Sequence, residues 1–169
     1  MKKVDYLIIQ STGSGEGIPV TKEDIIDLHT TDKRQGGFGF NRPGIDYLIQ
    51  PDGIMETLIS EDNPTTVDLW GVSEGKKGVV GICKHIAYVG GRTEKEVKSK
   101  DSRTMAQIKS LEAIVKFYIL KFPEIQVLGL DEAPAMKGEE NPAFNVSVWL
   151  EEIDVAEQNI FKKIKKENE

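Results

Sequence analysis

The sequence is poor in the side chains that bind transition metals or form disulfide bonds. It has one cysteine, Cys83, and two histidines, His29 and His85, among 169 residues. A single cysteine excludes an internal disulfide bond. Neither residue type occurs after Ile86. The second half of the chain therefore cannot supply the histidine or cysteine ligands that most zinc sites use.

Long apolar runs and an excess of positive charge are also absent. Only three apolar residues separate Tyr6 from Gln10, too few for the apolar core of a signal peptide. No stretch approaches the roughly 20 apolar residues that a membrane-spanning helix needs. The net charge of -6 and a pI near 5.1 disfavour nucleic acid and anionic lipid as partners. We therefore expect synthesis in a cytoplasm, without a signal peptide and without a membrane partner.

The apolar pattern that is present predicts one domain over residues 1–169. Branched apolar runs bounded by turns predict strands at 4–9, 45–50, 54–60, 82–89 and 125–128, with a hairpin turn at 51–53. Capping residues and apolar spacings of three and four predict helices at 21–31 and 104–122. Apolar residues at 148–164 predict a C-terminal helix, with a basic helical tail from about residue 151. The expected fold class is α/β (α+β), a single mixed central sheet flanked by helices.

Several short segments carry a family resemblance when their order and spacing are taken together. They are Asp27-Leu-His29, the segment 44–53, Ile86-Ala-Tyr-Val-Gly-Gly91, the segment 104–111, Val127-Leu-Gly129 and Asn141-Pro-Ala-Phe-Asn145. In this order they resemble the zinc-dependent N-acetylmuramoyl-L-alanine amidases. That group includes small phage lysozyme-type amidases and the peptidoglycan recognition proteins. The resemblance covers residue 4 to about residue 150.

The resemblance implies a zinc site whose ligands this chain lacks. In the family, three protein ligands hold zinc, and a zinc-bound hydroxide attacks the amide between muramic acid and L-alanine. Position by position, the ligands fall on Gln10, on Leu130 and on Asn141, or on Glu139 if the loop is aligned from Lys137. The butyl side chain of Leu130 has no electron pair to donate. We therefore expect no zinc and no other cofactor.

The same resemblance gives the residues expected to line a cleft. It places Ile45 and Asp46 at the tyrosine and histidine of the family's Gly-Tyr-His strand, and Ser73 near a further cleft histidine. Lys137 matches a lysine that would stabilise a developing oxyanion, and it is the only residual catalytic candidate. The expected cleft residues are Gln10, Ser11, Asp46, Ser73, Leu130, Lys137 and Asn141.

The remaining histidines and the cysteine have simpler structural interpretations. His29 matches a helix histidine of the family that lies away from the metal, which favours a structural, hydrogen-bonded role. Cys83 and His85 are two apart in a predicted strand and therefore share one face. They could form half of a metal site, but core packing is the better interpretation for Cys83.

Three further features allow more than one interpretation. Asp131, Glu132, Glu139 and Glu140 could do acid–base work or bind calcium or magnesium, although a solvated acidic loop is more common. The glycine-rich run at 13–17 lacks the Lys-Ser/Thr that follows in a phosphate-binding loop, which favours a flexible lip of the cleft. Trp70, in a polar segment at 61–81, could stack on a sugar ring or cap the core.

Two functional hypotheses follow. The first is a catalytically inactive amidase-like protein, which either binds a peptidoglycan fragment without metal or serves with other protein subunits in an assembly such as a phage virion. The second is an active amidase with a rebuilt site around Lys137, Glu139, Asp131 and His85. The missing ligands favour the first hypothesis.

Overall fold

The computed structural model describes residues 3–60, 69–70, 81–133, 136 and 140–162. The predicted strands and helices fall mostly inside these ranges. The irregular segment expected at 61–81 lies largely outside them. None of the helices in the described ranges is long and apolar enough to cross a membrane.

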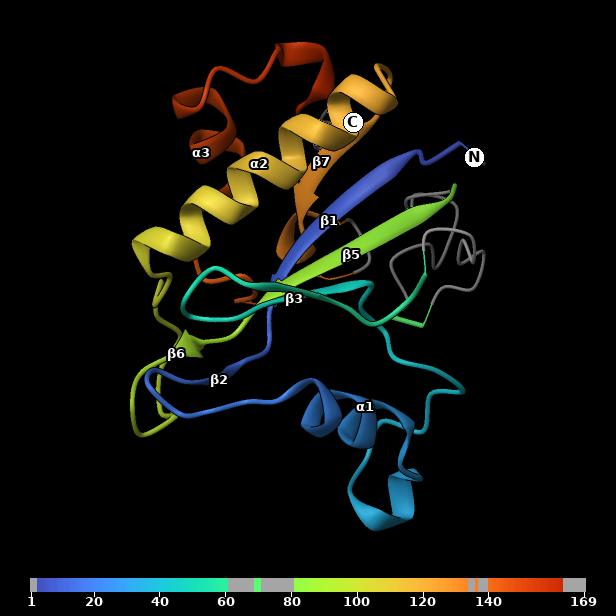
Figure 1. Cartoon of the computed structure of the whole chain (residues 1–169), viewed down its shortest axis with the longest axis vertical. Coiled ribbons are helices and arrows are strands. Elements are labelled where there is room, and N and C mark those ends of the chain that lie inside the picture. The colour runs from blue at the N-terminus through green and yellow to red at the C-terminus, as the bar shows by residue number, and fades with distance from the viewer. Residues whose placement is uncertain (1–2, 61–68, 71–80, 134–135, 137–139, 163–169) are drawn as a thin grey trace, which may run out of the picture.

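The strands form one five-stranded mixed sheet, in the order β4-β3-β5-β1-β7. Their bounds are β1 Tyr6–Ser11, β3 Tyr47–Ile49, β4 Met55–Thr57, β5 Cys83–Tyr88 and β7 Gln126–Gly129. All neighbouring pairs are parallel except the β3–β4 hairpin. The predicted mixed central sheet is confirmed, and its parallel strands bring β1, β5 and β7 to a common C-terminal edge (Figure 1).

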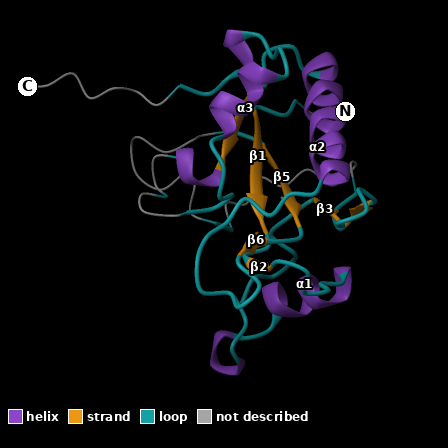
Figure 2. Ribbon diagram, turned by 90° about the vertical axis from the view of Figure 1, so that its left-hand side faces the viewer, coloured by secondary structure: helices purple, strands orange, loops and turns teal. Residues whose placement is uncertain are grey.

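Three α-helices flank this sheet: α1 (Lys22–Thr30), α2 (Met105–Lys121) and α3 (Val146–Glu152). The predicted capping boxes are confirmed at the starts of α1 and α2, where Thr21 and Thr104 each cap an amide three residues later. The long helix α2 lies on one side of the sheet (Figure 2). A small parallel pair, β2 (Ser14–Gly15) and β6 (Gly91–Arg92), lies beyond the ends of β1 and β5.

Successive residues of β1 face opposite sides of the sheet, and each side has its own apolar cluster. Leu7 and Ile9 pack on the α2 side, in the largest cluster. Ile8 packs on the other side, in a smaller cluster with Leu128 and Leu130. Because Gln10 is two residues from Ile8, its side chain belongs to this second side.

The C-terminal prediction was wrong beyond residue 152. The helix ends at Glu152, and Asp154 has a positive φ of 63°, which an α-helix does not accommodate. Ile160 then makes a parallel bridge to Val127, and the buried Asn159 donates to the Pro123 and Ile125 carbonyls. The chain therefore returns to the sheet edge instead of continuing as a helical tail. Residues 163–169 lie outside the described part of the chain.

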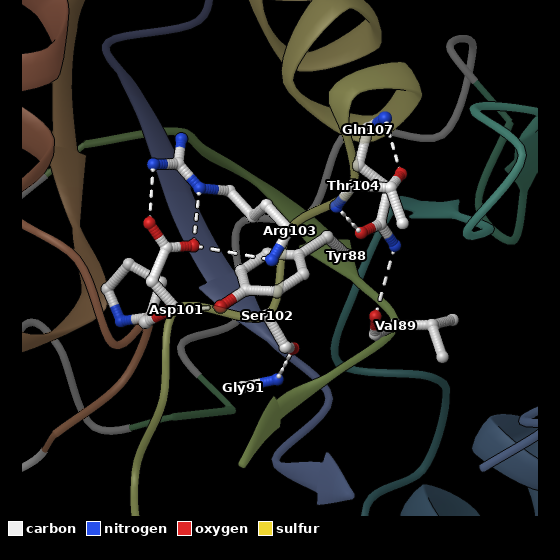
Figure 3. A network of polar contacts seen from close by, with 9 residues as sticks. Tyr88, Val89, Gly91, Asp101, Ser102, Arg103, Thr104 and Gln107 are labelled. Carbon is white, nitrogen blue, oxygen red and sulfur yellow. Dashed lines mark hydrogen bonds and ion pairs between the residues drawn. The ribbon is translucent and has the colours of Figure 1, made fainter. Parts of the chain in front are cut away.

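Gln107 joins α2 to the sheet and is fully buried. Its amide nitrogen donates to the Val89 carbonyl, and its amide oxygen accepts from the Thr104 amide (Figure 3). The same nitrogen also donates to the Ile49 carbonyl. Gln107→Met keeps the volume but removes these three bonds, so it should lower the free energy of unfolding by about 3 kcal/mol in urea titrations. Gln158→Met, at an exposed site, is the matched control. Equal urea-unfolding midpoints for the two variants would contradict this stabilising role of Gln107.

Candidate functional site

The three positions that match the family's zinc ligands do meet at the C-terminal edge of the sheet. Gln10 is the fifth residue of β1, and Leu130 directly follows β7. The parallel pairing of β1 with β7 ends at Ile9 and Gly129, so Gln10 and Leu130 each directly follow the last paired residues. Asn141 reaches the same edge through hydrogen bonds to Ser11. The topology therefore brings these three expected positions to one edge of the sheet.

The side chain of Gln10 is hydrogen-bonded to a residue of a neighbouring strand. Its side chain is 2% exposed, and its amide oxygen lies 2.8 Å from Nδ1 of His85, on β5. Because an amide oxygen only accepts, His85 donates from Nδ1 in this pair. Both side chains lie below the surface, so the interaction joins β1 to β5 and leaves no open polar position at residue 10.

Leu130 is part of an apolar cluster. It is 3% exposed and packs with Ile8, Cys83, Leu128 and Ala133. Cys83 belongs to this cluster too, as the core-packing interpretation predicted. The position that the resemblance assigns to a zinc ligand is therefore occupied by a buried hydrocarbon side chain.

Both polar atoms of the Asn141 side-chain amide are hydrogen-bonded to the backbone of one residue, Ser11. The Ser11 amide donates to Oδ1 at 2.7 Å, and Nδ2 donates to the Ser11 carbonyl at 3.1 Å. Ser11 itself is 5% exposed. This pair of bonds ties the segment before α3 to the end of β1.

Asp46, an expected cleft residue, belongs to a buried ion pair. It is 2% exposed and lies 3.2 Å from Nζ of Lys84, which is 1% exposed. Its second oxygen accepts from the His85 amide at 2.8 Å. Burial raises the pKa of the Asp46 carboxyl, and the Lys84 charge opposes that rise. Lys84 was not among the expected site residues, although a lysine inside a mainly apolar strand is a usable signal.

His29 is structural, as predicted. Its Nδ1 accepts from the Gly44 amide at 2.9 Å, and its ring contacts Phe38, Phe40 and Trp70. Burial lowers the pKa of His29 to about 4. Trp70 donates from Nε1 to the Gly44 carbonyl at 2.6 Å. Trp70 thus helps to close the aromatic cluster, and this favours the capping interpretation over sugar stacking.

Most amides of the glycine-rich run at 13–17 are hydrogen-bonded to other parts of the protein. The Gly13 amide donates to Oγ of Ser11, and the Ser14 and Glu16 amides donate to the carbonyls of Gly90 and Arg92. Gly15 is tightly enclosed, because a Cβ atom there would lie 2.7 Å from the Glu94 carbonyl. The run therefore contains β2 and its turn, hydrogen-bonded to neighbouring segments, and its flexibility as a lip of the cleft stays a prediction.

The acidic residues of the 131–140 loop do not form a metal-binding cluster in the described ranges. Across those ranges, no three His, Cys, Asp or Glu residues are placed to hold a metal ion. Glu132 instead accepts from the Gly129 amide and from Oγ of Ser147. Three predicted site residues, Ser73, Lys137 and Glu139, lie outside the described residues.

An open groove of about 1470 Å3 lies beside this edge of the sheet. Its lining combines apolar and acidic side chains from α3, from the segments that flank it and from the loop at 97–99. They include Val97, Glu140, Phe144, Val148, Glu151 and Phe161. Sequence reasoning missed this groove, because it joins segments that are far apart in the chain.

The fold is similar to solved cell-wall amidases and recognition proteins. No protein-family model and no curated protein matches the sequence. The N-acetylmuramoyl-L-alanine amidase LysC from Clostridium intestinale is 20% identical, with a TM-score of 0.60 over 89% of this chain and 83% of its own. The Ph2119 endolysin, from a Thermus scotoductus bacteriophage, is 16% identical, with a TM-score of 0.62 over 89% and 85%. Drosophila peptidoglycan recognition protein SA is 13% identical, with a TM-score of 0.58 over 97% and 84%.

This protein therefore has the fold that N-acetylmuramoyl-L-alanine amidases share with peptidoglycan recognition proteins. Gln10, Leu130 and Asn141, which the resemblance assigns to ligand positions, are not side chains that zinc prefers, since it favours histidine, cysteine and carboxylates; the alternative third position, Glu139, lies outside the described residues. Two are amides already hydrogen-bonded to the protein, and the third is a buried leucine.

The lowered pKa of His29 predicts a loss of stability in mild acid. The unfolded chain binds this proton with a pKa of about 6.5, whereas the folded chain binds it only near 4. Lowering the pH through this window therefore favours unfolding. His29→Asn keeps an acceptor for Gly44 and cannot titrate, so its melting temperature should fall less between about pH 7 and pH 4.5. Parallel pH profiles for the two proteins would contradict this assignment.

The buried ion pair predicts strong coupling between Asp46 and Lys84. Asp46→Asn leaves the lysine charge buried without its partner and should cost about 3–5 kcal/mol in urea unfolding. The double variant Asp46→Asn/Lys84→Met should cost less than the sum of the single changes.

The pH dependence of the Lys84→Met variant checks the same coupling. Because burial raises the folded pKa of Asp46, proton uptake favours the folded state as the pH falls. Lys84→Met should therefore cost less at about pH 5 than at about pH 8. Strictly additive, pH-independent costs would show that the two charges do not interact.

Proposed function

We propose that this protein is a catalytically inactive, amidase-like module that binds a peptidoglycan fragment without zinc. The proposal rests on the side chains found at the three expected zinc-ligand positions. Gln10 is bonded to His85, Leu130 is buried in an apolar cluster, and Asn141 is bonded to Ser11. No activated water can be generated by these side chains, since none is a good zinc ligand.

The fold supports peptidoglycan as the ligand class. Proteins of similar structure include one named for peptidoglycan recognition and an amidase that acts on N-acetylmuramoyl-L-alanine. Gln10, Ser11, Asp46 and Leu130 are buried and cannot touch a ligand. Among the described residues, the groove beside Asn141 is open at this edge, so we place the fragment there. Its apolar side chains would contact the non-polar parts of the fragment.

A second candidate is a structural role in an assembly, such as a phage virion. It is favoured by two apolar side chains on the outer face of α2. Phe117 is 51% exposed and Leu120 is 83% exposed, and they lie three residues apart on the helix. Exposed apolar side chains grouped on one helix face are typical of protein contacts. This candidate shares the inactive site and differs only in the surface used.

The first experiment separates an inactive protein from an active amidase. The zinc content of the purified protein, measured by elemental mass spectrometry, should be far below one ion per chain. Digestion of muropeptides should stay undetectable with zinc added. A metal-dependent release of stem peptide would instead establish the rebuilt active site around Lys137, Glu139, Asp131 and His85, and would overturn the proposal.

A matched pair of variants separates the two inactive roles. Calorimetric titration with a muropeptide should give heat. Val148→Asp, in the groove, should weaken binding about tenfold, as expected for the loss of one apolar contact. Leu120→Asp, on α2, should bind like the unchanged protein. If no heat appears and Leu120→Asp instead disrupts self-association or capture by virion proteins, the assembly role replaces the binding role.

A further inference from the structure

The segment Glu140–Pro142 is bonded to four other parts of the chain. The Glu140 carbonyl accepts from Oγ of Ser99 at 3.1 Å, and the Asn141 carbonyl accepts from the Asp131 amide at 2.9 Å. The Pro142 carbonyl accepts from the hydroxyl of Tyr88, at the end of β5, at 2.6 Å. The Asn141 side chain makes the fourth connection, to Ser11 of β1. This segment therefore closes the C-terminal edge of the sheet.

The hydrogen bonds of the Asn141 side chain replace those that β7 would make to Ser11 if it continued. In a parallel sheet, the backbone groups of successive residues point alternately to the two neighbouring strands. The Thr12 amide bonds to Tyr88 on the β5 side, so the amide and carbonyl of Ser11 point toward β7. The pairing of β1 with β7 ends at Ile9 and Gly129. The side-chain amide of Asn141 supplies the donor and the acceptor that β7 no longer provides.

We propose that Asn141 acts as a metal-independent clasp. In this chain it does the cross-linking that a metal ion would do at this edge in the family the sequence resembles. The clasp needs an amide, because one end must accept from the Ser11 amide and the other must donate to the Ser11 carbonyl. A carboxylate, which suits a metal, would place a second acceptor against that carbonyl. The substitution at position 141 thus exchanges a metal ligand for a backbone clasp.

Gln10 and His85 make a second bridge of the same kind. The amide of Gln10, at another ligand position, accepts from the ring of His85 and joins β1 to β5. Two of the three ligand positions therefore carry amides that connect strands or strand ends. This inference concerns folding and holds whether or not the groove binds a peptidoglycan fragment, so its test can fail independently of the proposed function.

A matched pair of substitutions tests the clasp. Asn141→Asp keeps the size of the side chain and removes its donor, so its melting temperature should fall by roughly 4–10 °C. Asn145→Asp makes the same chemical change four residues away. Asn145 uses only its acceptor, as the N-cap that receives the Val148 amide, and aspartate caps equally well. Asn145→Asp should therefore melt within about 2 °C of the unchanged protein.

Three results would overturn the clasp. Asn141→Asp could have the same melting temperature as the unchanged protein, which would show that the donor is not needed. The melting temperatures of both variants could fall equally, which would assign the loss of stability to repulsion by nearby acidic side chains. A chelator could lower the melting temperature of the unchanged protein, or added zinc could raise it, which would show that a metal still joins this edge.

Hydrogen exchange of the unchanged protein keeps the test valid if Asn141→Asp does not fold. The Ser11 amide should be protected from exchange, because Asn141 accepts from it. Exchange of this amide at the rate of an open loop would also overturn the clasp.

Discussion

The parallel pairing of β1 with β5 and β7 is the constraint on which the rest of this structure depends. It places the central strand between two neighbours and buries its apolar side chains on both faces. It also sends three strand ends, with their polar backbone groups, to one edge. Buried backbone groups need partners, so the residues that follow these strands must supply them. The side chain of Asn141 serves this need for the amide and carbonyl of Ser11.

Much of the fold could be predicted from the sequence, because local rules specify it. The apolar runs predicted the strands, and the Thr-x-x-Asp and Thr-x-x-Gln patterns predicted the helix starts at Thr21 and Thr104. The C-terminal helix was overextended for a physical reason. Apolar residues after Glu152 have a helix-like spacing, but tertiary contacts decide their structure, since Ile160 is bridged to Val127. Periodicity alone does not reveal such an override.

Three of the expected site positions lie close together, but their burial and their partners could not be predicted. The family resemblance pointed to Gln10, Leu130 and Asn141, and the topology brings them to one edge. The partners of these residues could not be predicted, because they lie far away in sequence: His85 is 75 residues from Gln10. The buried pair of Asp46 and Lys84 was missed for the same reason, since the two residues are 38 apart. Long-range polar contacts are thus the part of the site that a single sequence conceals.

The bonds between Ser11 and Asn141 span 130 residues of sequence. Their formation therefore belongs to a late stage of synthesis. While the ribosome is still making the first half of the chain, β1 exists without the groups that complete its end. A metal ion could be captured only after its ligands are made as well, but it would have to be supplied by the cell. A clasp built from the chain itself ties completion of this edge to translation, because both partners of the bond are made by the ribosome.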